Sequence, residues 1–254
     1  MNKITISILT LIFIFFGSSC VNNTKEKSEQ PRNEDIKEEQ ITFDESEGIA
    51  STSKNLYFVF DGSGSMKENC SGRKKIDGAR MAINTFLSKV PENINIGLAI
   101  FGVKDNKYGI KEVVPLGIDN RNDFKDAING VNPDGGTPLH NATNLGLVKL
   151  VEQYKKQLGY GEYRLIIVTD GMASDESLFK SALIRSIRYP FISIYGIGLC
   201  INGNHLLKTY SIAYYDAQNY EELGAALEET SAELNVFDPE SFNLDDLIDE
   251  ANVN

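Results

Sequence analysis

The sequence predicts a doubly wound α/β fold, in which helices cover both faces of a mostly parallel sheet. Short apolar runs alternate along the chain with segments whose apolar residues recur at helical spacing, and this alternation is typical of parallel strands joined by helices. The runs are apolar at consecutive positions, so both faces of each strand are expected to be buried. The 254 residues suffice for one large domain with flanking segments.

The strands are predicted where the apolar runs lie, at residues 56–60, 96–101, 165–168 and 191–197. Residues 111–116 are expected to form an antiparallel strand at one edge of the sheet. This segment contains Pro115, which has no N–H to donate and is therefore tolerated only at an edge.

The helices are predicted in the segments between the strands. Ile76, Ala79, Ile83, Phe86 and Val90 are spaced so that they lie on one face of a first helix. Further helices are expected at residues 122–128, 139–158, 176–187 and 220–234. Together the strands and helices define one domain over residues 54–234.

The first twenty residues are expected to be a secretory signal peptide. Lys3 precedes an apolar stretch over residues 4–16, and small residues then lead to Cys20. This stretch of about 13 apolar residues is shorter than the roughly 20 that span a bilayer. The pattern resembles a bacterial lipoprotein signal, in which Cys20 becomes the lipidated N-terminus, with Gly17 in place of the usual Leu. Ordinary signal cleavage near this position is the alternative.

Either kind of signal exports the mature protein to the bacterial cell envelope. Val21 follows Cys20 where an Asp would resemble an inner-membrane retention signal, so the outer membrane is favoured, facing the periplasm or the cell surface. Residues 21–53 are poor in apolar side chains and are expected to be a disordered acidic tether. Residues 235–254 are expected to be an acidic C-terminal tail.

The overall charge argues against nucleic acid as a partner. The chain has 36 acidic and 25 basic residues and a formal net charge of -11, which repels nucleic acid and anionic membrane surfaces. Contact with the membrane is therefore expected through the lipid anchor only.

Three loops carry short oxygen-bearing side chains to one edge of the predicted sheet. Asp61, Ser63 and Ser65 follow a strand in the stretch DGSGS, Thr137 lies in GGTPL, and Asp170 ends another strand in TDG. In open α/β sheets, ligands bind at the carboxyl ends of the strands, where the strand order reverses. Carboxylate and hydroxyl oxygens are the ligands that hard cations such as Mg2+ prefer. The sequence therefore predicts a metal site at this edge.

These three motifs, in this order and after these strands, resemble the metal-ion-dependent adhesion site of von Willebrand factor type A domains. The resemblance covers roughly residues 54–234 and implies a Rossmann-like domain. It further implies that Ser63, Ser65 and Thr137 contact the ion through their hydroxyls, while Asp61 and Asp170 hold it directly or through water. Mg2+ is the expected ion, with Mn2+ and Ca2+ as alternatives. The family usually uses the site for binding, a ligand carboxylate completing the coordination shell.

The function predicted on this basis is non-enzymatic, metal-dependent binding of a protein partner, in adhesion or in assembly of a complex. Two carboxylates with three neutral hydroxyls leave the ion undercompensated, so the partner is expected to offer an Asp or Glu side chain. Because the site is expected at the surface, replacing Asp61 should cost little stability. A scaffold within a membrane complex, whose metal serves stability, is the alternative. Residues near the site that are candidates for partner contact are Gly62, Met66, Gly136, His140 and Gly171.

Three classes of enzyme fit the sequence poorly. A haloacid dehalogenase-like phosphatase also places a strand-terminal Asp beside Mg2+, but it needs a second acid where this chain has Ser63, and Gly171 follows Asp170 in place of an acid. The serine hydrolase motif G-x-S-x-G and the P-loop motif are both absent. The two histidines, His140 and His205, are expected to be helix-surface or capping residues, with His140 close enough to the metal face to touch a ligand.

Cys70 and Cys200 are expected to form a disulfide. Export places the chain in a compartment that permits disulfides. Cys70 lies just beyond Ser65, and Cys200 lies just beyond the strand at residues 191–197, so both loops should emerge on the face that bears the metal. Two buried free thiols are the alternative.

The acidic tail suggests a hypothesis about regulation. Asp245, Asp246 or Asp249 could act as an internal ligand that occupies the metal until a partner displaces it. Deletion of the residues after Leu234 is then expected to strengthen partner binding, as measured by calorimetry. An unchanged affinity would contradict the hypothesis.

Overall fold

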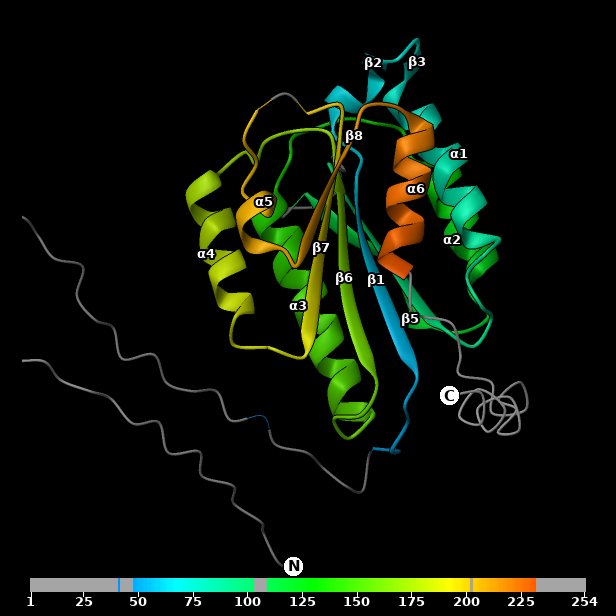
Figure 1. The fold of residues 1–254 in the computed structure, drawn as a ribbon, viewed down its shortest axis with the longest axis vertical. Coiled ribbons are helices and arrows are strands. Elements are labelled where there is room, and N and C mark those ends of the chain that lie inside the picture. Colours follow the sequence, from blue (N-terminus) through cyan, green and yellow to red (C-terminus); the bar gives the residue numbers. More distant parts are fainter. Residues whose placement is uncertain (1–40, 42–47, 103–108, 202, 232–254) are drawn as a thin grey trace, which may run out of the picture. The chain divides into compact units, whose positions relative to one another are not determined.

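The computed structural model describes residues 41, 48–102, 109–201 and 203–231 (Figure 1). The signal peptide with Cys20, most of the tether and the acidic tail lie outside these residues, so the predictions about them stay predictions. In the part of the chain that the structure describes, no helix combines the length and apolar character needed to cross a membrane.

The elements in chain order are β1 (Lys54–Asp61), the 3-10 helix η1 (Gly64–Lys67), β2 (Asn69–Cys70), β3 (Arg73–Lys74), α1 (Lys75–Leu87), β4 (Asn95–Phe101), β5 (Ile110–Gly117), α2 (Arg121–Asn129), α3 (Leu139–Lys156), β6 (Glu162–Thr169), α4 (Glu176–Ser186), β7 (Ile192–Leu199), α5 (Leu207–Tyr210), β8 (Ala213–Ala217) and α6 (Tyr220–Ser231).

The main sheet has six strands in the order β5-β4-β1-β6-β7-β8. β5 pairs antiparallel with β4, and every other neighbouring pair of this sheet is parallel. This arrangement confirms the predicted Rossmann-like fold and its antiparallel edge strand. The strand order reverses between β1 and β6, which places the ends of these two strands at the switch point where ligands bind in such sheets.

Helices cover both faces of the sheet (Figure 1). One core cluster joins the sheet to α1, α2 and α6, and a second cluster joins it to α3, α4 and α5. β1 contributes to both clusters, because successive side chains of a strand point to opposite faces. Leu56, Phe58 and Phe60 face the first cluster, whereas Tyr57 and Val59 face the second. This double burial explains why the strand is apolar at consecutive positions.

The sequence did not predict β8, η1, α5 or the short β2-β3 hairpin. β8 is an edge strand that pairs with β7 alone, and three of its five residues are half-buried. It therefore lacks the consecutive apolar run by which the central strands were recognised. The predicted helices are all present, with ends that differ by a few residues, and the last part of the predicted segment 220–234 lies outside the described residues.

Phe58 is expected to be a large contributor to stability. Its ring packs edge-on against Phe86 of α1 and Phe124 of α2, with centroid distances of 5.6 and 5.3 Å. Phe58→Ala should lower the free energy of unfolding by about 3 to 5 kcal/mol, because it leaves a cavity between the sheet and both helices. Urea unfolding of the mature protein measures this change. The exposed Val148 provides a control, and a loss no larger than that of Val148→Ala would contradict the assignment.

Candidate metal centre

Three loops meet at the carboxyl ends of β1, β4 and β6, held by backbone hydrogen bonds. Gly62 N–H donates to Phe101 O at 2.9 Å, and Gly62 O accepts from Asp134 N–H at 2.8 Å. Gly102 is needed at this crossing because its φ is +80° and an added Cβ would lie 2.5 Å from the backbone nitrogen of Ser63. The loop that carries Thr137 is thereby brought against the loop that carries the serines.

Asp61 links the loop after β1 to the end of β6. Its Oδ1 accepts from Ser63 N–H at 2.8 Å, and its Oδ2 accepts from Thr169 Oγ1 at 2.7 Å and from Asp170 N–H at 3.2 Å. The carboxylate is fully buried, so the expectation that Asp61 can be replaced at little cost does not hold. Thr169 was not predicted as part of the site, although it stands beside Asp170 in the stretch TDG.

The two serines connect to Asp170 through their hydroxyls. Ser63 Oγ lies 2.9 Å from Ser65 Oγ, and Ser65 Oγ donates to Asp170 Oδ1 at 2.7 Å. A serine hydroxyl has one hydrogen to donate, so Ser63 is the donor in the first bond. The three side chains form a continuous row of oxygen atoms across two loops.

Thr137 approaches the same row from the third loop. Its N–H donates to Ser174 Oγ at 2.9 Å, which fixes the backbone beside the hydroxyl. A Cβ built on Gly171 would lie 3.9 Å from Thr137 Oγ1 and 4.0 Å from Ser65 Oγ, so both hydroxyls flank Gly171. The structure therefore brings together the five side chains that the sequence predicted as metal ligands. Their role as ligands stays a prediction.

The buried carboxylates make the site electrostatically suited to a cation. Burial, followed by the charge of Asp170, raises the pKa of Asp61 to about 6, although hydrogen bonds from Ser63 and Thr169 oppose the shift. Within the described residues, no three His, Cys, Asp or Glu side chains gather into a metal-binding group, so a cation held here depends on the hydroxyls as well. The all-oxygen set fits a hard divalent cation.

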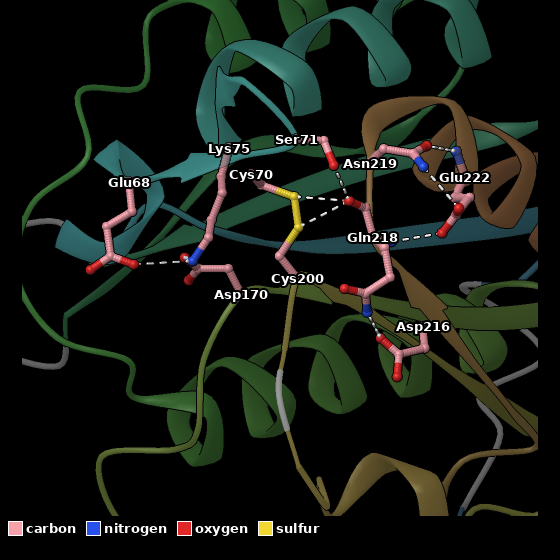
Figure 2. The surroundings of a disulfide bond; sticks show 10 residues. All are labelled: Glu68, Cys70, Ser71, Lys75, Asp170, Cys200, Asp216, Gln218, Asn219 and Glu222. Carbon is pink, nitrogen blue, oxygen red and sulfur yellow. Dashed lines mark hydrogen bonds and ion pairs between the residues drawn. A yellow bond between two sulfur atoms is a disulfide. The ribbon is translucent and has the colours of Figure 1, made fainter.

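Lys75 is a charged member of the site that the sequence did not reveal. It is the first residue of α1 and is buried, and its Nζ donates to Asp170 Oδ2 at 2.9 Å and to Glu68 Oε2 at 3.3 Å. Figure 2 shows Lys75 reaching Asp170 beside the disulfide. Burial lowers the pKa of Lys75, but the contacts with Asp170 and Glu68 outweigh it and raise the pKa overall. Arg73 and Lys74, its neighbours, are exposed, and nothing in the sequence separates Lys75 from them.

The residues expected to contact a partner divide into two groups. Gly136 is exposed, and His140 and Gly171 are half-buried, so all three reach the surface. The expectation is wrong for Met66 and Gly62. Met66 is fully buried in the core cluster beneath α1, and Gly62 is buried with both its N–H and its carbonyl hydrogen-bonded.

His205 was expected at a helix surface or at a cap. Its Nδ1 accepts from Leu207 N–H at 3.2 Å, so the histidine caps the start of α5. The side chain is buried, which corrects the expectation of a surface position. The cap gives one of the two ring nitrogens of this buried side chain a hydrogen-bond partner.

A disulfide joins Cys70 to Cys200 next to the site (Figure 2). The two Cα atoms are 6.3 Å apart and the cysteines are separated by 130 residues. Ser71 Oγ, beside Cys70, donates to Gln218 O at 2.8 Å, so the hairpin that follows the serines contacts both the end of β7 and the turn before α6. The loop that carries Ser63 and Ser65 is thereby fixed at its far end.

The chain matches the von Willebrand factor type A domain family over residues 55–250. Uncharacterized protein YwmD of Bacillus subtilis (strain 168) is 25% identical over 190 residues, which are 68% of this chain and 83% of that protein. The pilus adhesin SpaC of Lactobacillus rhamnosus GG aligns with a TM-score of 0.59 at 15% identity, over 74% of this chain and 31% of the adhesin chain. The manganese-loaded TRAP protein of Plasmodium vivax aligns with a TM-score of 0.50 at 19% identity, over 72% of this chain and 74% of that chain. Because both identities are low, these two alignments show a shared fold and nothing more about this chain.

Removal of the disulfide is expected to destabilise the domain. Because the bond closes a long loop in the unfolded chain, the variant Cys70→Ser/Cys200→Ser should lose about 3 to 5 kcal/mol of unfolding free energy. Urea unfolding compares the variant with the unreduced mature protein. Wild-type protein treated with reductant serves as the control and should show a similar loss. Two titratable thiols in unreduced protein would contradict the pairing.

Proposed function

Because the chain belongs to the von Willebrand factor type A domain family, we propose that it is a protein-binding module and not an enzyme, and that partners bind at the carboxyl edge of its sheet. The observation that carries this proposal is the convergence of five oxygen-bearing side chains from three loops at the switch point between β1 and β6. The site offers carboxylates and hydroxyls. His140 has the one imidazole that reaches the surface among the described residues, and in this part of the chain its ring forms no hydrogen bond with Asp61 or Asp170.

The proposed ligands of a divalent cation are Asp61, Ser63, Ser65, Thr137 and Asp170. The cation, when bound, would supply a Lewis-acidic position for a carboxylate of the partner. We propose Mg2+ as the ion, with Mn2+ and Ca2+ as alternatives, and the manganese-loaded TRAP structure supports a divalent cation in a domain of the same fold.

The chain contributes both the shape and the rigidity of this binding edge. Asp61, with three hydrogen bonds, orients the backbone of Ser63 and Asp170. Ser63 and Thr137 are buried and Ser65 is half-buried, so we propose that a partner approaches the hydroxyl row from the side of Ser65, next to Gly136 and Gly171. Both glycines reach the surface. A partner that offers Asp or Glu fits this edge best.

The proposed placement of the domain is the bacterial cell envelope. We propose that residues 1–20 are a lipoprotein signal, that Cys20 carries the lipid, and that residues 21–53 connect the anchor to the domain at 54–234. The outer membrane is favoured. The family match continues to residue 250, past the proposed boundary at 234, so part of the proposed tail belongs to the matched region.

The alternative function is a scaffold within a membrane complex. In this alternative the metal serves stability, and one observation favours it: Asp61 and Asp170 are both buried, so a cation held between them would stabilise the fold. A partner complex that survives chelation would support the scaffold.

The metal site is tested first by calorimetric titration of Mg2+, Mn2+ and Ca2+ into chelator-treated mature protein. One ion is expected to bind, and Ser65→Ala should abolish binding or weaken it about tenfold or more, because it removes a ligand and breaks the row to Asp170. Ser65 is preferred over the buried Asp61 because its loss should leave the fold intact. The exposed Ser181 of α4 provides the control Ser181→Ala. Binding that is unchanged in Ser65→Ala, with a normal circular dichroism spectrum, would contradict the proposed site.

A further inference from the structure

Lys75 is the charged side chain that the proposed ligand set leaves unexplained. Its ammonium group reaches Asp170 Oδ2 at 2.9 Å, while Asp170 Oδ1 accepts from Ser65. Its second partner, Glu68, has a side chain that is 68% exposed, so water screens that carboxylate. The buried ion pair is therefore the one with Asp170, whose side chain has no exposed surface.

We propose that Lys75 is a positioning residue that sets the cation affinity of this site: it holds Asp170 when no cation is bound and weakens the binding of a divalent cation until an acidic partner is present. This inference rests on the proposed function and assigns to Lys75 the control of that same site.

Charge balance is the physical basis of the inference. Asp61 and Asp170 together carry two negative charges when ionised, which equal the charge of a divalent cation, so these two carboxylates alone do not leave the ion undercompensated as the sequence suggested. With Lys75 in the cluster, the same cation leaves one positive charge in excess. One carboxylate from a partner removes this excess, so the lysine makes a partner carboxylate part of the most favourable state of the site. Burial strengthens these interactions, because the local dielectric is lower than that of water.

The geometry also explains how the lysine could serve as an internal cation. Lys75 lies at the start of α1, where Lys75 N–H donates to Glu68 O at 2.9 Å, so its backbone is fixed to the loop that follows the serines. The ammonium group binds the same carboxylate that Ser65 binds, on the other oxygen. A cation that binds Asp170 therefore binds a carboxylate whose two oxygens already accept hydrogen bonds. The positive charge of Lys75 repels this cation.

The test is calorimetric titration of Mn2+ alone into the chelator-treated mature protein, its Lys75→Met variant and its Lys75→Arg variant. Lys75→Met should bind Mn2+ about tenfold or more tightly than wild type, because one opposing charge at ion-pair distance has been removed. Lys75→Arg keeps the charge and should bind more like wild type than like Lys75→Met. The exposed neighbour Lys74 provides the matched control Lys74→Met, which removes a screened charge and should change the affinity little.

Thermal unfolding in chelator gives a second reading. Lys75→Met should melt at a lower temperature than wild type in chelator, and Mn2+ should raise its melting temperature more than that of wild type, because a cation that binds the folded state stabilises it. If Lys75→Met folds only when Mn2+ is present, the proposal is supported. If it remains unfolded with Mn2+, the lysine is a structural residue that a cation cannot replace, and the proposal is overturned.

The outcomes separate this inference from the proposed function. Mn2+ binding that Ser65→Ala abolishes, but that Lys75→Met leaves equal or weaker, overturns the role of Lys75 and leaves the metal site standing. Binding by wild type that Ser65→Ala abolishes, together with tighter binding by Lys75→Met, supports both. If neither protein binds Mn2+ while both are folded, both proposals fail.

Discussion

The candidate site depends on the hydrogen bonds that the buried carboxylate of Asp61 accepts. β1, with β4 and β6 on either side, carries this residue to the point where the strand order reverses. There its two oxygens accept three hydrogen bonds, from the loop that bears the serines and from the end of β6. A carboxylate that orders two loops at once must be bonded in this way, because a buried charge without partners would be costly. The positions of Ser63 and Asp170 follow from it.

Two carboxylates placed so close together create a second constraint. Their burial and repulsion raise the pKa of Asp61, and the structure relieves the repulsion through Lys75, whose ammonium group pairs with Asp170 at 2.9 Å. The charged side chains of the protein are therefore sufficient to keep Asp61 and Asp170 in place. A binding site that is formed before its ligand arrives loses less entropy on binding, and this is the advantage of preorganisation.

The remaining contacts keep this edge of the sheet rigid. Gly102 lets β4 end against the backbone of Ser63, and the bond from Asp134 to Gly62 draws in the loop that bears Thr137. The disulfide from Cys70 to Cys200 adds a covalent link from the serine loop to the end of β7. Gly62 and Cys200 directly follow β1 and β7, so these links hold the loops close to the ends of the central strands.

The sequence by itself determined the layers of the fold and the five oxygen-bearing residues. Strands that are buried on both faces are apolar at consecutive positions, and Asp61 and Asp170 stand where such runs end. The local sequence pattern was therefore sufficient to predict the strands and the residues that follow them. The tertiary structure alone decided that Lys75 points inward while Lys74 is exposed, that Met66 is buried beneath α1, and that β8 joins the edge of the sheet. These features depend on contacts between distant segments: Lys75 and Asp170 are 95 residues apart. Periodicity reports which face of an element is buried, but it does not report which residue of another element lies against that face.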